Sequence, residues 1–419
     1  MFQIIVVVVA FGLMPVLMRR FKLPTWQATL IASLLIHLVA LRSWPASIEA
    51  VRGVFTWGNL NTVLAIILVG VLSALMKRYG MLDAIITSAK GLIHNRKILI
   101  ALVPAVIGLL SVPGGAYLSA PFVNSLGEEM GMPKPRRAAV NLTYRHVTML
   151  VSPFSALMLY ITSLLQGQSV YTLIGLNLPF VAVMALAAAR LYLPKGRQLA
   201  QAEPGISKAR HARSLLLGLS PILVVLLSNA LVKLPMAGAL ALAILYVWAL
   251  NAREKDFMAQ AVGGIKYDVA LIIVAVLLAQ NTVFQLHDLR AVIAQAFTAS
   301  SQWTMLFTVF LGALFLGTIT GLYYMSVGLF LPILFTTTVG AAALPYIFFI
   351  AVFSFLGYYF SPLHLCQVLT LKAIDVGQKP VFREHIRLAP LLALAALAGC
   401  GGLDVGLHAL PPIHRFRRS

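Results

Sequence analysis

Long apolar runs alternate with short polar segments along the whole chain. About ten runs have the length that a helix needs to cross the roughly 30 Å hydrocarbon core of a bilayer. We expect spans at residues 2–18, 25–41, 60–76, 139–166, 171–193, 214–231, 235–251, 268–284, 342–371 and 388–404. The pattern therefore predicts an all-α polytopic membrane protein with about ten transmembrane helices.

Two further apolar runs, roughly 98–126 and 303–336, are interrupted near their centres. The sequences SVPGG (111–115) and GTITG (317–321) stand at the interruptions. Glycine permits tight turns, and proline ends or kinks a helix. We interpret both runs as re-entrant hairpins, which enter and leave the membrane on the same side.

The two halves of the chain resemble each other at a nearly constant offset. FKLPTWQATL (21–30) resembles VKLPMAGALA (232–241), and LVSPFSAL (150–157) resembles YFSPLHLC (359–366). Each repeat then holds five spans and one hairpin. Because five is odd, the repeats have inverted topology, which is typical of alternating-access carriers.

These repeats define the expected domains. The first repeat covers residues 1–193, with its hairpin at about 98–126 and a broken helix at about 139–166. A basic, cytoplasmic linker covers residues 194–213. The second repeat covers residues 214–419, with its hairpin at about 303–336 and a broken helix at about 342–371.

The basic residues indicate the orientation in the membrane. Most of the 32 Lys and Arg residues fall in loops that are cytoplasmic if the N-terminus lies outside. The C-terminal HRFRRS, placed outside, disagrees with this bias. The first apolar run has no basic residue before it, so we expect a retained helix rather than a cleaved signal peptide. We expect a multi-pass protein of a bacterial or archaeal cytoplasmic (inner) membrane, with both termini outside.

Composition narrows the class further. Hydrophobic residues make up 60% of the 419 residues and charged residues 11%, with a mean hydropathy of +0.92. The net charge of +20 is scattered among short loops, so we expect contact with membrane lipid and no nucleic-acid partner. No HExxH, GxSxG or Walker loop is present, and Cys366 and Cys400 lie in apolar segments without metal-ligand spacing. The chain is therefore not expected to be an enzyme or an ATP-driven pump.

Ser-Pro pairs stand in the middle of the runs at 139–166 and 342–371, at Ser152-Pro153 and Ser361-Pro362. Serine is a preferred helix N-cap and proline a preferred first helical residue. We therefore expect each pair to start a half-helix after a short unwound stretch. The alternative is a proline kink, which is common in membrane helices.

The interruptions supply uncharged oxygen atoms and exposed backbone groups at membrane depth. Released carbonyls and hydroxyls suit Na⁺, whereas helix N-termini suit anions. We expect possible Na⁺ binding near Ser111, Ser152, Thr318, Thr320 and Ser361. Close helix packing is the alternative role of the small residues at the hairpin tips.

Three ionisable residues fall within the broken helices. Arg145 and His146 precede Ser152, and His364 follows Ser361. An arginine can hold a carboxylate or phosphate with two hydrogen bonds, and a histidine can carry a proton. Arg145 could instead extend its charge to the interface, and His364 could be a hydrogen-bonded core residue. No Asp or Glu is expected at the midplane, which favours Na⁺ held by neutral oxygens.

At these residues the chain resembles the ion transporter superfamily of secondary carriers, which includes citrate, dicarboxylate, gluconate and lactate carriers. The segment SVPGGAYLSAPFV, followed by NLTYRHVTMLVSPFSALML, more closely resembles a bacterial and archaeal integral membrane family of unknown function. The resemblance implies a homodimer with a scaffold part and a moving transport part. It also implies coupling to Na⁺ or H⁺.

The resemblance places a substrate and ion site between the hairpin tips and the broken helices. The expected site residues are Ser111, Pro113, Gly114, Gly115, Arg145, His146, Ser152, Pro153, Thr318, Thr320, Gly321, Ser361, Pro362 and His364. The Ser-Asn-Thr signature of the sodium-coupled dicarboxylate branch is missing from the tips and breaks.

We therefore expect a secondary active transporter for a small anionic organic solute. The alternatives are an ion exchanger or antiporter, which would need a titrating group such as His364, and a membrane scaffold without transport activity.

Overall fold

The computed structural model describes residues 2–109, 115–164, 169–196, 207–251, 255–265, 267–287, 289, 291, 302–334 and 343–409. These residues form helices and turns and contain no β-strand, which confirms the predicted all-α class. The first half contains α1 (Phe2–Arg20), α2 (Thr25–Leu35), η1 (Ile36–Ala40), α3 (Trp44–Val54), α4 (Trp57–Arg78), α5 (Met81–Leu92), α6 (Arg96–Leu109), α7 (Gly115–Glu129), α8 (Lys134–Val147), η2 (Thr148–Leu150), α9 (Ala156–Leu164) and α10 (Val170–Tyr192). The second half contains α11 (Lys208–Ala230), α12 (Met236–Leu250), α13 (Phe257–Gly263), α14 (Tyr267–Gln285), α16 (Gln302–Thr320), α17 (Tyr323–Leu334), α18 (Leu344–Phe360), α19 (Leu365–Ile374), α20 (Gln378–His385) and α21 (Ala389–Ala409).

Several helices have the length and composition of membrane spans. Within the described residues six helical segments qualify: Phe2–Arg20, Trp57–Arg78, Val170–Tyr192, Lys208–Ala230, Tyr267–Gln285 and Leu344–Ile374. Many of their large apolar side chains face outward, such as Val8, Leu186 and Leu217. A soluble protein rarely exposes so much contiguous apolar surface, so the chain is a multi-pass membrane protein.

Four helices were not expected from the apolar runs: α3, α5, α13 and α20. They are short, and α5 carries Asp83 in its first turn and Lys90 in its last. A search for continuous apolar runs misses such helices because only one of their faces is buried.

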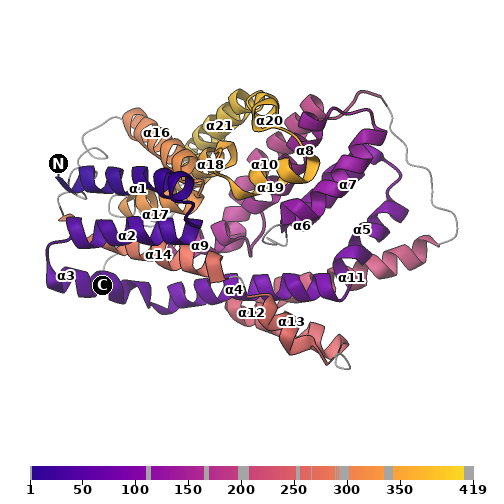
Figure 1. Cartoon of the computed structure of the whole chain (residues 1–419), viewed down its shortest axis with the longest axis horizontal. Coiled ribbons are helices and arrows are strands. Elements are labelled where there is room, and N and C mark those ends of the chain that lie inside the picture. Colours follow the sequence, from indigo (N-terminus) through magenta and orange to yellow (C-terminus); the bar gives the residue numbers. More distant parts are fainter. Residues whose placement is uncertain are drawn as a thin grey trace.

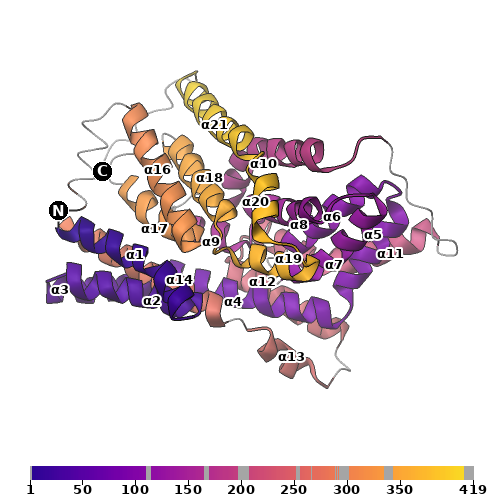
Figure 2. The same cartoon turned by 45° about the horizontal axis from the view of Figure 1, so that its top comes forward.

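The helices form two groups (Figures 1 and 2). In Figure 1 α4 runs along one side of the molecule with α11 and α12, whereas α6, α7, α8 and α10 lie on the other side with α18, α19 and α21. Packing follows this division. α4 contacts α12, and α12 contacts α11, while α8 packs against α6, α7 and α10.

Most helices of the predicted interrupted segments lie in the second group, and α16 and α17 pack against its member α18. The run at 98–126 holds α6 and α7, and the run at 303–336 holds α16 and α17. The run at 139–166 is divided into α8, η2 and α9, and the run at 342–371 into α18 and α19. The helices that follow these two breaks each pack on the other half of the chain. α9 contacts α17, and α19 contacts α7.

The most polar of these helices is also buried. In α8 every residue from Arg137 to Val147 is buried, although its sequence, KPRRAAVNLTYRHV, is rich in polar residues. The helix begins after Pro133 and carries Pro135 near its first turn, where a missing backbone N–H has no cost. Buried polar groups need partners, and Asn141 finds one across the two halves by donating to Thr370 Oγ1 at 3.0 Å. The polar face of α8 is therefore held against the second half of the chain.

Candidate functional site

A cavity of about 210 Å³ lies where the breaks meet. Its wall includes Arg145 and Met149 before the first break, Thr320 and Gly321 at the α16–α17 turn, and Tyr358 and Cys366 on either side of the second break. Residues of α2, α4 and α14 close the remaining side. The cavity therefore joins both groups of helices.

Three half-helices begin at this cavity. Ala156, Tyr323 and Leu365 are the first residues of α9, α17 and α19, and all three line the wall. The first turn of a helix carries backbone N–H groups without helical partners and a partial positive charge. Three helix ends that attract anions thus border one small space.

Arg145 adds a full positive charge to the same wall. Its side chain is only 6% exposed, and a Cβ atom at Gly115 would overlap its Nη1 atom. Gly115, the first residue of α7, therefore leaves the space that the guanidinium occupies. Among the side chains that the structure describes, no Asp or Glu is buried. Electrostatically, the site suits an anion better than a cation.

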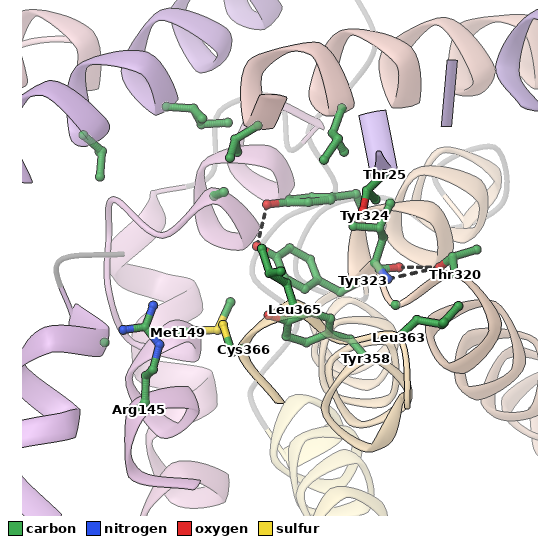
Figure 3. A pocket seen from close by; sticks show the side chains of 18 of the residues that line it. Thr25, Arg145, Met149, Thr320, Tyr323, Tyr324, Tyr358, Leu363, Leu365 and Cys366 are labelled. Carbon is green, nitrogen blue, oxygen red and sulfur yellow. Dashed lines mark hydrogen bonds between the residues drawn. The ribbon is translucent and has the colours of Figure 1, made fainter. Parts of the chain in front are cut away.

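The opposite end of the cavity is aromatic (Figure 3). Tyr323 donates a 2.7 Å hydrogen bond to Tyr324 Oη, and the Tyr323 ring packs edge-on against Tyr358. Arg145, Met149 and Cys366 lie at the other end. Such a site presents a charged end and an apolar, hydroxyl-bearing end to a bound solute.

The α16–α17 turn is fixed by local chemistry. Gly321 has φ +65, a left-handed conformation that side-chain-bearing residues rarely adopt. Thr320 Oγ1 donates to Leu316 O at 2.6 Å and accepts from Leu322 N at 3.1 Å. The predicted tip at 317–321 thus turns at its last residue.

A family model described as "Protein of unknown function (DUF401)" matches residues 54–400. The chain belongs to the DUF401 family. This agrees with the predicted resemblance to a membrane family of unknown function. Membership of the ion transporter superfamily stays a prediction.

A solved transporter has a similar fold. The crystal structure of the YdaH transporter from Alcanivorax borkumensis, reported to have an unusual topology, aligns with a TM-score of 0.56 at 15% identity. The alignment covers 87% of this chain and 90% of that one. At this identity the likeness concerns the fold. No curated protein matches the sequence.

In this DUF401 protein the two predicted histidines meet behind the cavity. His146 Nε2 lies 2.9 Å from His364 Nε2, and both side chains are buried. His146 Nδ1 lies 2.6 Å from Leu142 O. Because a carbonyl can only accept, Nδ1 of His146 carries a proton, and its Nε2 accepts from His364 when both rings are neutral.

The two Ser-Pro serines make equivalent contacts. Ser152 Oγ donates to Leu109 O at 2.9 Å, and Ser361 Oγ donates to Thr318 O at 2.6 Å. Both bonds reach back 43 residues, to the first helix of the adjacent interrupted run. The serines fasten each break to its neighbouring helix pair and do not line the cavity.

The expected N-cap role of these serines is wrong. α9 begins at Ala156, and Ser155 Oγ accepts from Met158 N at 3.2 Å. α19 begins at Leu365, and Ser361 Oγ accepts from Leu363 N at 3.1 Å inside the turn. Consequently Pro153 and Pro362 lie in the unwound segments, ahead of the helices they were expected to start.

The other predicted site residues fall into three sets. Arg145, Thr320 and Gly321 line the cavity, and Gly115 contacts Arg145. Thr318 Oγ1 donates to Gly357 O at 3.3 Å and supports the second break. Ser111, Pro113 and Gly114 fall outside the described residues.

Sequence reasoning missed Cys366. Its sulfur and the nearest nitrogens of His146 and His364 all lie within 4.8 Å of one another, a donor set that suits a soft transition metal. Yet the two histidines are already at hydrogen-bonding distance, and the cationic Arg145 stands nearby. The spacing His364-x-Cys366 was the only local signal, because His146 comes from the other half of the chain.

Proposed function

We propose that this DUF401 protein is a secondary active transporter for a small anionic organic solute. The main support for this proposal is the cavity at which α9, α17 and α19 begin, beside the buried Arg145. Partial positive helix ends and a guanidinium are groups that bind carboxylates or phosphonates. The transporter fold of YdaH supports the same reading.

We further propose that transport follows alternating access between two inverted repeats. The equivalent Ser152 and Ser361 bonds support this, as does the exchanged packing of α9 on α17 and α19 on α7. In such carriers the site stays near the midplane while one group of helices moves against the other. In this proposal the group containing α8 and α18 moves, and the group containing α4 and α12 is the scaffold.

The remaining features of the proposal follow from the sequence. The protein is placed in a bacterial or archaeal inner membrane with both termini outside, as a homodimer. Coupling to Na⁺ or H⁺ supplies the driving force. A sodium site would draw on hydroxyls and carbonyls near Ser152, Thr318 and Ser361.

Ligand-dependent thermal unfolding of the purified protein tests the proposal. The protein in detergent is compared in Na⁺ and K⁺, with mono-, di- and tricarboxylates, sugar acids and phosphonates. A ligand that binds only the folded state raises the melting temperature by mass action. We expect one anion class to do so, and to be taken up by liposomes that contain the protein.

Two outcomes would contradict the proposal. Uptake of an inorganic ion without any organic anion would favour the ion exchanger, for which the paired His146 and His364 supply a titrating group. If no solute or ion crosses the liposome membrane, the transporter proposal fails and the scaffold reading gains support.

A further inference from the structure

We infer that His146 and His364 form a single proton-binding site, which takes up one proton at His364 Nδ1 when an anion occupies the neighbouring cavity. The inference rests on the proposed transporter function and names H⁺ as the coupling ion. Its basis is the position of the hydrogen atoms that the two short contacts require.

The protonation state of the neutral pair is fixed by geometry. His146 Nδ1 must donate to Leu142 O, at 2.6 Å, so its Nε2 is a lone-pair acceptor. His364 Nε2 must then donate across the 2.9 Å contact, which leaves His364 Nδ1 without a proton. Leu142 O thus fixes the tautomer of His146, and His146 fixes the tautomer of His364.

His364 Nδ1 is the open position of the pair. This buried nitrogen has no hydrogen-bond partner among the residues that the structure describes. A proton added there keeps both existing hydrogen bonds, and the bond between the rings becomes charge-assisted. A second proton would have to enter at Nε2 and would break the bond between the rings. The pair therefore accommodates one proton and not two.

The surroundings link this proton to an anion. The titratable and charged groups around the pair are Arg145 on α8, Tyr358 and Tyr359 on α18, Cys366 on α19 and His385 on α20. None of these groups is a carboxyl group, and Arg145 carries a positive charge. A second positive charge beside Arg145 is costly until an anion enters the cavity, since charges interact strongly away from water.

The histidine pair also connects the two halves of the chain next to the cavity. His146 lies on α8 of the first half, and His364 lies in the break between α18 and α19 of the second half. Tyr358, whose ring centroid is 4.1 Å from that of His364, lines the cavity directly. Proton uptake thus changes the contact between the two broken helices next to the bound solute.

Imidazole ¹⁵N NMR of the histidine-labelled full-length protein in liposomes tests the proton site. Spectra are recorded from pH 8.5 to 5, without added anion and with succinate, citrate, gluconate or lactate. We expect His146 to keep a protonated Nδ1 throughout, and a single new N–H to appear at His364 Nδ1. The inference is overturned if both rings stay neutral to pH 5 under all conditions, or if both Nε2 atoms become protonated.

Variants assign the signals and provide the control. His364→Gln keeps a donor toward His146 and removes the titration, and His146→Gln keeps an acceptor toward His364. His37 is also buried, with Nδ1 2.9 Å from Thr282 Oγ1, and it lies away from the cavity wall. His37→Gln should leave the new N–H unchanged. Each of the first two variants removes one ring of the pair, so if one of them misfolds the other still assigns the signals.

A pH-sensitive dye inside the same liposomes tests the coupling. With the membrane potential clamped, inward movement of one of these anions should acidify the lumen in the wild type. In His364→Gln, any anion that still enters should do so without acidification, whereas His37→Gln should acidify the lumen as the wild type does. Anion uptake by the wild type that needs Na⁺ and leaves the lumen pH unchanged would overturn proton coupling and leave the transporter proposal standing. If no anion moves, the transporter proposal fails, and the NMR titration alone decides the proton site.

Discussion

Ser152 and Ser361 occupy equivalent positions in the two halves of the chain, 209 residues apart. Each hydroxyl donates to a backbone carbonyl 43 residues earlier, Leu109 O for Ser152 and Thr318 O for Ser361. Each serine is followed three residues later by an N–H that bonds its carbonyl, in Ser155 and His364. The same turn is therefore built twice from largely different neighbouring side chains.

Replacing either serine by alanine should weaken the protein by a similar amount. The change leaves a buried carbonyl without its hydroxyl donor, which costs about 1–3 kcal/mol of unfolding free energy. Chemical unfolding in detergent measures this loss, and uptake in liposomes should fall in both variants. Ser33→Ala is the control, because the buried Ser33 hydroxyl bonds Thr29 O within its own helix. Normal uptake by the Ser152 and Ser361 variants would contradict the role assigned to the breaks.

Gly108→Ala and Gly317→Ala should both be destabilising. A Cβ at Gly317 would lie 2.8 Å from Tyr358 N and 2.9 Å from Ser354 O, and one at Gly108 would overlap Arg145 O. Backbone atoms cannot rotate away, so overpacking should cost about 1–3 kcal/mol. Thermal unfolding in detergent compares these variants with Gly175→Ala.

Gly175 is a suitable control because nothing lies within 4 Å of its Cβ position in α10. Alanine there should be neutral or stabilising by up to about 1 kcal/mol, owing to its higher helix propensity. Equal melting temperatures for all three variants would show that the helices do not approach as closely as described.

Arg145→Gln should abolish the rise in melting temperature that a bound anion produces. The side chain loses its charge and its paired donors, which together contribute about 1.5–3 kcal/mol, or roughly ten- to a hundredfold in affinity. Arg145→Lys keeps the charge and should retain part of the binding. Arg190 is exposed, so Arg190→Gln should bind as the wild type does. Undiminished binding by Arg145→Gln would remove Arg145 from the site.

His385 should make the folded state sensitive to acid. The residue ends α20, outside the spans, and burial lowers its pKa from 6.5 to about 3, with a further contribution from the nearby His146 and His364. As the pH falls below 6.5, His385 of the unfolded chain binds a proton, whereas His385 of the folded protein stays neutral. Its contribution to stability is therefore complete above pH 6.5 and declines at lower pH, by at most about 1.4 kcal/mol per pH unit.

Chemical unfolding between pH 5 and 8 compares the wild type with His385→Gln. The difference between the two unfolding free energies should shrink as the pH falls, because glutamine does not titrate. A difference that is independent of pH would show that folded His385 takes up its proton as readily as the unfolded chain does.

Much of the secondary structure could be predicted from the sequence. The apolar runs at 2–18, 60–76 and 171–193 became α1, α4 and α10 with small shifts at their ends. Such runs are local signals, because the length of a helix in lipid is set by the bilayer and every backbone group must bond within the helix. Proline also favours the interruptions at Ser152-Pro153 and Ser361-Pro362, since it restricts the residue before it. The same pair at Ser220-Pro221, however, lies within the continuous helix α11.

The sequence therefore determined many of the helices and the places where a break is favoured, for reasons contained in short stretches of chain. Only the tertiary structure decided which breaks meet. His146 and His364 are 218 residues apart, and the contact between them, like the approach of Gly115 to Arg145, depends on how α8 packs against α7 and α19. Close-packed contacts arise from the shapes of many side chains together, and no local pattern encodes them. For the same reason Ser155 became the cap of α9 in place of Ser152, whose hydroxyl was drawn to Leu109 O.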